Sequence, residues 1–323
     1  MRVVSLVPSA TESLCLVGGE GFLVGRSHEC DFPASIADRP ALTSQRTAFT
    51  TSAEVDREVS AALGKGQSLY HLDVDRLRKL RPDVILTQDV CSGCAVDHET
   101  VRGAAAEMDP EPRVLSLNPE SFEDVLDDLV RIGRAVCLDE QAQRAVVSLR
   151  DRFFSAADFV NPYEEPPRVV FLEWVDPPYA AGHWTAQLVE RAGGSHPLNP
   201  TTALANAGAG AGAQMAHRAA GASVRVTGGA IAAAGGEALI VCPCGLDLER
   251  TRREVGAIAG EEWFRTMPAV REGRVALVDG SQMFNRPGPR LVDAYEWLVW
   301  WLGAMRCDAL RARVEGFPWS PPA

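Results

Sequence analysis

Three short stretches of the sequence hold side chains that could bind a metal ion or act as nucleophiles. They are a run of four polar residues, a pair of cysteines separated by two residues and a pair separated by one: His28, Glu29, Cys30 and Asp31; Cys91 and Cys94; Cys242 and Cys244. Thiolate and imidazole ligands favour zinc, iron or an iron–sulfur cluster, and closely spaced cysteines can share one ion. The paired cysteines are therefore candidate ligands of Zn or Fe–S, with burial as small apolar side chains as the alternative.

These polar groups all fall where a β-strand is expected to end. Four short apolar runs, at 22–25, 84–88, 169–172 and 239–241, lead into them in turn: His28 to Asp31, Cys91 and Cys94, Glu173 and His183, and Cys242 and Cys244. The carboxyl ends of parallel strands share one edge of a sheet, where ligands bind in open α/β folds. If the strands are parallel, we expect the groups to converge on a cleft between two lobes.

Strand-like and helix-like segments alternate in both halves of the chain. Residues 2–7 form a short β-branched run, and the helical pattern at 10–17 ends at Gly18 and Gly19. In the second half, residues 168–173 form a buried-strand pattern and 184–192 a helical one. Alternation of this kind predicts an α/β fold with two Rossmann-like lobes, each built on a mainly parallel sheet.

A different pattern occupies the middle of the chain. Apolar residues recur at helical spacing from Phe122 onward, and no glycine or proline lies between Arg134 and Val160. This predicts one helix of roughly 35 residues, well beyond the usual 8 to 20. We expect it to link the lobes, which gives an N-terminal lobe at 1–119, a linking helix at 120–160 and a C-terminal lobe at 161–323.

Composition excludes several classes of protein. The chain has 323 residues, of which 46% are hydrophobic and 23% charged, as in ordinary globular proteins. Its net charge of −11 and the lack of a basic block argue against a nucleic-acid partner. No apolar stretch is long enough for a membrane span, so we expect no integral membrane protein.

The same reasoning gives an expected location. The first residues resemble a strand more than an export signal, and eight cysteines are too sparse for a disulfide scaffold. We therefore expect a cytoplasmic protein, which argues against docking to an ABC transporter.

Four segments, at 2–12, 80–85, 175–182 and 284–290, resemble a known family and keep its order along the chain. The chain is similar to the cobalamin-binding branch of the ABC-transporter substrate-binding proteins. These belong to the helical-backbone class, with a domain of the Fe/B12 periplasmic-binding type, which also binds iron siderophores and haem. The polar and cysteine clusters resemble a non-exported subgroup of that family. The resemblance implies two α/β lobes, a long connecting helix and a ligand between the lobes.

The resemblance also implies positions that contact the ligand. They follow the first strand, the first strand of the second lobe and the last strand: Pro8 and Ser9; Pro178 and Tyr179; Phe284, Arg286 and Pro287. A corrin ring needs a broad apolar surface with a few polar groups, which Trp174, Trp184 and the strand-end residues His28, Glu29, Cys30, Glu173 and His183 could supply. Each aromatic residue could instead pack within its own lobe.

The preferred interpretation is a small-molecule binding protein for cobalamin, another corrinoid or a related metal-containing ligand. A cobalt corrinoid could take an axial imidazole or thiolate, for which His28 and Cys30 are the candidates. The alternative is a metal-dependent enzyme that uses the Cys, His and Glu cluster with Zn or Fe–S. No G-x-S-x-G, P-loop or H-E-x-x-H motif is present, which favours binding over catalysis.

Overall fold

The computed structural model describes residues 1–46, 50–64, 68–89, 96, 98–204, 218–303, 305 and 307–322. The chain divides into two compact units. Unit 1 comprises 1–50, 54–119 and 123–149, and unit 2 comprises 51–53, 120–122 and 150–323. Both are α/β units, which confirms the fold class predicted from the sequence. The predicted domain boundaries at 119 and 160 stay a prediction.

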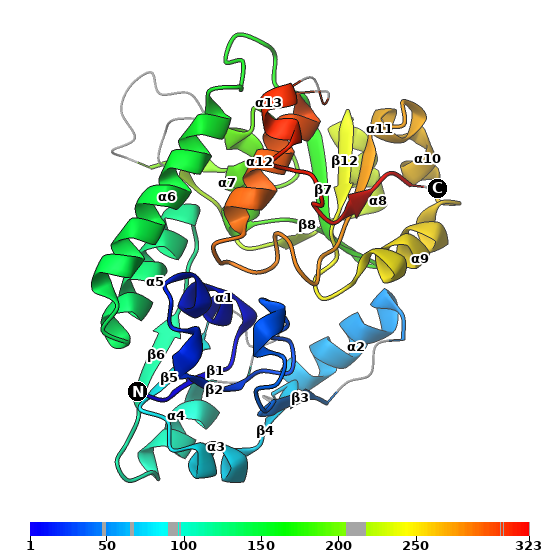
Figure 1. The fold of residues 1–323 in the computed structure, drawn as a ribbon. Coiled ribbons are helices and arrows are strands. Elements are labelled where there is room, and N and C mark those ends of the chain that lie inside the picture. The colour runs from blue at the N-terminus through cyan, green and yellow to red at the C-terminus, as the bar shows by residue number, and fades with distance from the viewer. Residues whose placement is uncertain are drawn as a thin grey trace. The chain divides into compact units, whose positions relative to one another are not determined.

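Unit 1 is built on a parallel four-stranded sheet of order β2-β1-β5-β6 (Figure 1). Its strands are β1 (Val3–Ser5), β2 (Leu23–Arg26), β5 (Val84–Gln88) and β6 (Arg113–Leu117). A separate antiparallel ribbon pairs β3 (Thr43–Gln45) with β4 (Tyr70–Leu72). The helical segments are α1 (Pro8–Leu16), η1 (Glu20–Phe22), η2 (Ala34–Ile36), α2 (Ser52–Leu63), α3 (Val74–Leu80) and α4 (His98–Ala106).

Alternate residues of the unit 1 strands enter one core. Val4 and Ile85 point to the face that is covered by Leu77 of α3 and Val101 of α4. Because side chains alternate across a strand, Val3 and Leu86 belong to the opposite face, and both are fully buried. A parallel sheet buried on both faces explains why these strands are almost continuously apolar in the sequence.

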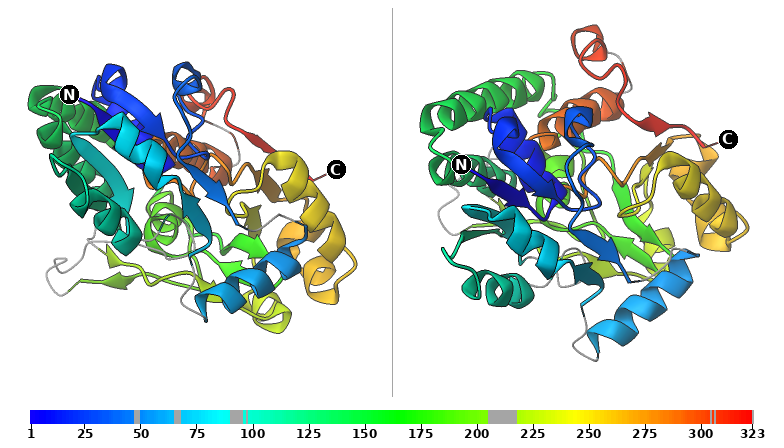
Figure 2. Two further views of the ribbon diagram at one scale, coloured as in Figure 1. Left: turned by 90° about the horizontal axis from the view of Figure 1, so that it is seen from below. Right: turned by 60° about the horizontal axis from the view of Figure 1, so that its bottom comes forward.

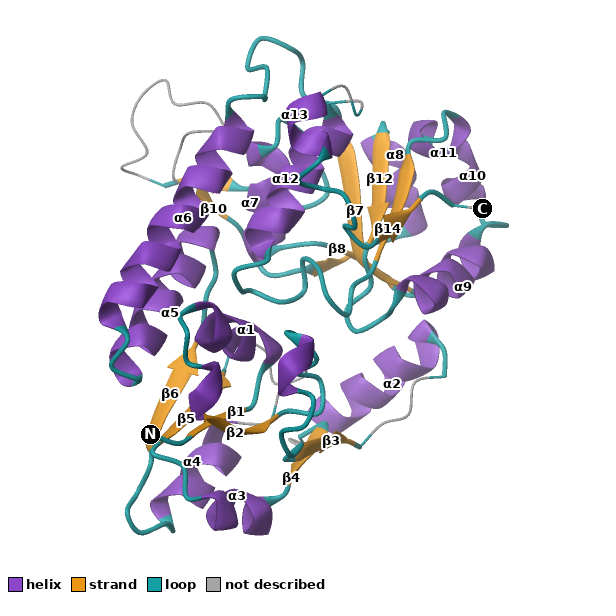
Figure 3. Ribbon diagram, in the orientation of Figure 1, coloured by secondary structure: helices purple, strands orange, loops and turns teal. Residues whose placement is uncertain are grey.

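Unit 2 contains a six-stranded mixed sheet of order β11-β8-β7-β12-β13-β14 (Figure 3). The strands are β7 (Val169–Val175), β8 (Pro178–Ala180), β11 (Val224–Arg225), β12 (Ala238–Val241), β13 (Val275–Val278) and β14 (Trp319–Ser320), and β9 (Thr202–Ala203) pairs with β10 (Arg218–Ala219) apart from them. The three central strands β7, β12 and β13 are parallel, and the outer strands are antiparallel.

Two sets of helices cover the faces of this sheet. The helices are α7 (His183–Arg191), α8 (Gly228–Ala234), α9 (Leu248–Ile258), α10 (Glu262–Thr266), α11 (Pro268–Arg271), α12 (Leu291–Leu302) and α13 (Asp308–Arg311). Val170 and Leu239 of the sheet pack against Ile231, Val255 and Phe264, which come from α8, α9 and α10. Figure 2 shows α9 to α11, in yellow and light orange, gathered on one side of this sheet.

The predicted single long helix is wrong, because the segment forms two helices. They are α5 (Phe122–Ala135) and α6 (Asp139–Ala157). Cys137 adopts a left-handed conformation with φ of 59°, and the Leu138 N–H donates to the Gly133 carbonyl over 2.8 Å. This six-to-one hydrogen bond is typical of a Schellman motif, in which a left-handed residue ends the helix. Glycine usually occupies that place, so a cysteine there does not signal the end of a helix.

Among the described residues, no helix combines the length and the apolar character needed to cross a membrane.

Candidate functional site

The carboxyl end of β1 leads directly into α1. Pro8 is the first residue of that helix, where its missing N–H costs nothing, and Val7 precedes it as the cap. Pro8 and Ser9 are both buried. They therefore lie at the strand end where the sequence placed them, and their contact with a ligand stays a prediction.

The loop after β2 carries His28, Glu29 and Cys30, and Arg26 holds it in shape. The Arg26 guanidinium donates to the carbonyls of Ser27, Cys30, Ala37 and Arg39 over 3.0 to 3.1 Å. Four carbonyls on one planar cation fix the backbone of the loop without regular secondary structure. The polar run is thus placed rigidly at the carboxyl end of the sheet.

His28 is held on one side of its ring. Its Nδ1 lies 2.7 Å from Thr43 Oγ1, and its backbone N–H donates to the same oxygen over 3.0 Å. The ring centroid is 5.8 Å from that of Tyr70. Burial, and to a smaller extent the positive charge of Arg26, lowers the pKa of His28 below its ordinary value, so the imidazole is neutral at neutral pH.

Glu29 and Cys30 have partners within unit 1. Tyr70 donates its hydroxyl to Glu29 Oε1 over 3.3 Å. Cys30 is buried, and its Sγ lies 3.0 Å from the hydroxyl of Thr11 on α1. No sequence pattern pointed to Thr11, Thr43 or Tyr70, because each reaches the loop from another part of the chain.

In unit 2 the candidate residues lie at the ends of β7 and β8. Trp174 pairs with Tyr179 in the antiparallel register of these two strands, and Pro178 begins β8. Trp174, Pro178 and Tyr179 are all partly exposed. Glu173 accepts a hydrogen bond on its carbonyl from the Cys244 N–H over 3.1 Å, which joins the end of β7 to the loop after β12.

His183 and Trp184 begin α7. His183 is left-handed, with φ of 48°, and its N–H donates to the Gly221 carbonyl over 2.8 Å. Its ring stacks on Trp184 at 5.5 Å, and burial lowers its pKa. Trp184 Nε1 donates to the Phe284 carbonyl over 2.6 Å and leaves the indole partly exposed. The indole therefore has a fixed orientation and a free apolar surface.

Phe284 belongs to the core of unit 2. Only 1% of it is exposed, and its ring lies edge-on to Phe171 at 4.9 Å and to Trp297 at 6.1 Å. Its left-handed backbone turns the carbonyl toward Trp184. The backbone carbonyl of Phe284 therefore orients the Trp184 indole, while the Phe284 side chain packs in the core. Arg286 is buried and Pro287 partly buried beside it.

Of the two cysteine pairs predicted to bind metal, the structure describes Cys242 and Cys244. Cys91 and Cys94 lie outside the described residues. Cys242 is fully buried, and burial raises the pKa of its thiol well above the ordinary value, whereas Cys244 is exposed. Within the described ranges, no group of three or more His, Cys, Asp or Glu could hold a metal ion. The Zn or Fe–S alternative stays a prediction.

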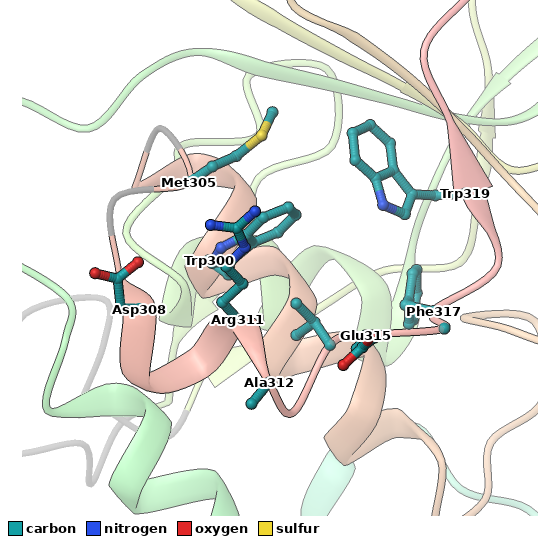
Figure 4. A pocket seen from close by; sticks show the side chains of 10 residues that line it. Trp300, Met305, Asp308, Arg311, Ala312, Glu315, Phe317 and Trp319 are labelled. Atoms are coloured by element: carbon teal, nitrogen blue, oxygen red, sulfur yellow. The ribbon is translucent and has the colours of Figure 1, made fainter.

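A cavity of about 760 Å³ lies elsewhere in unit 2 (Figure 4). It involves none of the residues predicted from the sequence. Aromatic and charged side chains near the C-terminus line it: Trp300, Met305, Asp308, Arg311, Ala312, Val314, Glu315, Gly316, Phe317 and Trp319. Trp300 and Trp319 contact each other edge to face at 6.2 Å, so the two rings leave no slot between them for a planar ligand.

Solved structures of other proteins share this fold. The periplasmic heme-binding protein RhuT from Roseiflexus sp. RS-1 is 19% identical, with a TM-score of 0.66 over 94% of this chain and 98% of its own. A periplasmic heme-binding protein from Pseudomonas aeruginosa is 18% identical, with a TM-score of 0.67 over 94% of this chain and 92% of its own. The periplasmic vitamin B12 binding protein BtuF of Vibrio cholerae is 16% identical, with a TM-score of 0.63 over 95% of this chain and 98% of its own.

The chain therefore has the fold of the periplasmic heme- and vitamin B12-binding proteins. No protein-family model matches its sequence, and no curated protein matches it. Because similar structures include heme-binding as well as B12-binding proteins, the cobalamin branch stays a prediction.

The predicted cytoplasmic location is wrong. It rested on the weak resemblance of the first residues to an export signal and on the sparse cysteines. The similar structures are those of periplasmic proteins, which contradicts it. A protein of this fold needs no disulfides outside the cytoplasm, because each unit here has a large apolar core.

Proposed function

We propose that this chain is a substrate-binding protein for a metal-containing tetrapyrrole, either a corrinoid or a haem. The observation that carries the proposal is the fold, which matches heme- and B12-binding proteins over more than nine-tenths of this chain. The specific ligand and the residues that contact it are part of the proposal. Delivery of the ligand to an ABC importer belongs to the same proposal, since a similar structure from Listeria monocytogenes is an ABC transporter substrate-binding protein.

The chemistry of the strand ends supports this class of ligand. A tetrapyrrole presents a broad apolar ring with polar groups at its rim. In unit 2, Trp174, Tyr179 and Trp184 are partly exposed aromatic side chains at the ends of β7 and β8 and the start of α7. In unit 1, His28 and Glu29 offer polar groups on a rigid loop. Rigid aromatic surface with a few placed polar groups suits this kind of ligand.

The test is calorimetric titration of the purified protein with hydroxocobalamin and, separately, with haemin. We expect one-site binding to at least one of them with a dissociation constant of about 1 μM or tighter. Heat from neither ligand, in protein shown to be folded, would overturn the proposal. Binding of only one of the two ligands would assign the protein to the corrinoid-binding or to the haem-binding branch.

A matched pair of variants locates the binding surface. Tyr179→Ala removes a partly exposed ring at the end of β8, and we expect it to weaken binding about tenfold. Tyr163→Ala is the control, because Tyr163 is 95% exposed in the loop before β7. Equal affinities in the two variants would remove Tyr179 from the site.

A further inference from the structure

Two unfavourable backbone conformations meet at the Trp184 side chain. His183, which directly precedes it, has a left-handed φ of 48°, and Phe284, whose carbonyl accepts the Trp184 Nε1 hydrogen over 2.6 Å, has one of 58°. They are two of the five non-glycine residues with a positive φ in the part of the chain that the structure describes. A residue with a Cβ is strained in this conformation, and bulky residues rarely adopt it. Conformational strain is therefore concentrated around one indole.

The start of α7 holds His183 in this conformation. Its N–H donates to the Gly221 carbonyl over 2.8 Å, and an ideal Cβ on Gly182 would lie 2.5 Å from that same oxygen. The His183 ring stacks on Trp184, with centroids 5.5 Å apart and planes 23° from parallel. In this position its Nδ1 is buried and has no hydrogen-bond partner among the described residues. The stacked ring is thus kept at two costs, the backbone conformation and an unpaired polar atom.

Packing in the core of unit 2 holds Phe284. The residue is 1% exposed, and its ring lies edge-on to Phe171 and Trp297. The next residue, Asn285, donates through Nδ2 to two backbone carbonyls over 3.0 and 3.1 Å, which fixes the turn. The Phe284 carbonyl is therefore held in one direction, toward Trp184 Nε1.

The Trp184 indole is consequently fixed at its polar atom and along its ring, and it is still partly exposed. Backbone strain and unpaired polar atoms persist only where the surrounding structure enforces them, and they cluster at ligand-binding sites. A rigid aromatic surface also binds a ligand without the entropy cost of ordering a mobile side chain. These observations distinguish Trp184 from an aromatic residue that only fills space in the core.

We propose that the Trp184 indole is the anchor on which the tetrapyrrole ring packs, and that His183 and Phe284 are positioning residues that fix its orientation. This rests on the proposed function. The ring system of a haem or a corrinoid is broad and apolar, and an aromatic side chain of fixed orientation offers it a matching apolar surface. His183 and Phe284 act through Trp184, because one supports its ring and the other accepts its N–H.

The first experiment measures the affinity and the stability of the same variants. Hydroxocobalamin, haemin and metal-free protoporphyrin IX are each titrated into the full chain. We expect Trp184→Ala to lose at least about tenfold in affinity for each probe that the wild type binds. His183→Gly relieves the left-handed backbone and removes the stacked ring, so its affinity should fall about fivefold while its urea midpoint stays equal or rises. A merely structural residue would lose stability together with affinity.

Arg81→Gly is the matched control, because Arg81 is also left-handed, with φ of 43°, and ends α3 in unit 1. It should keep or gain stability in the same way and bind each probe like the wild type. Unchanged affinity in His183→Gly, or a loss of affinity that comes with a lower urea midpoint, would overturn the positioning role of His183.

Two further variants test whether the positioning residues act through Trp184. Trp184→Phe keeps an aromatic ring and removes the Nε1 hydrogen that Phe284 accepts. Its affinity should fall about fivefold, and wild-type affinity would overturn the role of Phe284. In the Trp184→Ala background, His183→Gly should cause no further loss, because residues that act as a unit are not additive. A further loss as large as in the wild type would mean that His183 acts independently of Trp184, which overturns its positioning role.

The outcomes also separate this inference from the proposed function. If the wild type binds a probe and Trp184→Ala, shown to be folded by its urea transition, binds it equally well, the anchor role is wrong and the proposed function stands. If the wild type binds no probe, both are wrong. Trp184→Leu replaces Trp184→Ala if the alanine variant does not fold.

Discussion

Single residues control the loop that follows β12. Asn285 Nδ2 donates to the carbonyls of Cys242 and Gly280 over 3.1 and 3.0 Å, so one amide joins the end of β12 to the end of β13. The approach is close enough that an ideal Cβ on Gly280 would lie 1.9 Å from the Pro243 carbonyl oxygen. Gly280 is therefore required for its small size.

Gly280→Ala should destabilise unit 2 by about 2 kcal/mol or more, because the clash is with backbone that cannot move aside cheaply. Urea unfolding, followed by tryptophan fluorescence, measures the change. Gly256→Ala is the control, since its Cβ on the exposed side of α9 meets nothing within 4 Å. That substitution should stabilise the helix by up to about 1 kcal/mol. Equal effects at the two positions would contradict the steric argument.

His196 gives unit 2 a dependence on pH. Its ring is buried, with Nδ1 3.1 Å from the Val169 carbonyl and Nε2 3.0 Å from the Ala181 carbonyl. Burial lowers the pKa of His196 below its ordinary value of 6.5, although the two carbonyls act in the opposite direction. Between the two pKa values the unfolded chain binds more protons than the folded one. Stability therefore falls as the pH is lowered through this range.

We expect the unfolding free energy that depends on His196 to decrease by up to about 0.8 kcal/mol from pH 7.5 to pH 6.0. The measurement is the difference in unfolding free energy between the wild type and His196→Asn at the two pH values. Asp128, whose pKa burial raises to about 6, acts in the opposite direction but is present in both proteins and cancels. A difference that does not change with pH would mean that His196 keeps its ordinary pKa.

At the scale of elements, the junction between α5 and α6 contains a non-glycine residue in a left-handed conformation, which a substitution can relieve. Cys137 is exposed, and its left-handed backbone is unfavourable for a residue with a Cβ. The two helices approach closely here, because an ideal Cβ on Gly133 would lie 2.4 Å from Cβ of Ala142. The break is thus fixed by both backbone geometry and packing.

Cys137→Gly should stabilise the protein by about 1 kcal/mol, because glycine adopts this conformation without steric cost. Cys137→Ala is the matched control and should change little, since it keeps the Cβ. The midpoint of chemical unfolding at a constant slope reports the effect. Destabilisation by glycine would show that the thiol makes an important contact.

At the scale of the whole molecule, the two units have separate cores, and the unfolding of the protein is expected to respond to a bound ligand. A ligand that binds only the folded state stabilises it by about 2.7 kcal/mol at a concentration one hundred times its dissociation constant. Haemin or hydroxocobalamin, whichever binds, should therefore raise the unfolding temperature of the protein.

Differential scanning calorimetry with and without the ligand checks this prediction. Protoporphyrin IX serves as the probe without a metal. An unfolding temperature that neither haemin nor hydroxocobalamin raises would contradict the proposed binding.

Much of the fold was predictable from local patterns. Apolar runs such as 84–88 and 169–172 and the turns that follow them predict βα units, because hydrophobic periodicity and glycine positions act within a few residues. The same patterns placed His28 after a strand, whereas Tyr179, which was expected in the loop after 169–172, lies within β8. The outer antiparallel strands of unit 2 are short, and β14 has only two residues, so they left little pattern to detect.

Only the tertiary structure decided which of these residues touch one another. The burial of Phe284 depends on Phe171 and Trp297, and the orientation of the His28 ring depends on Thr43, fifteen residues further on. The end of α5 depends on a cysteine that takes a conformation usually left to glycine. The sequence by itself determined the α/β class and the strand ends, because those follow from short-range periodicity. The core, the helix break and the orientation of the His28 ring depend on contacts and backbone geometry that periodicity does not encode.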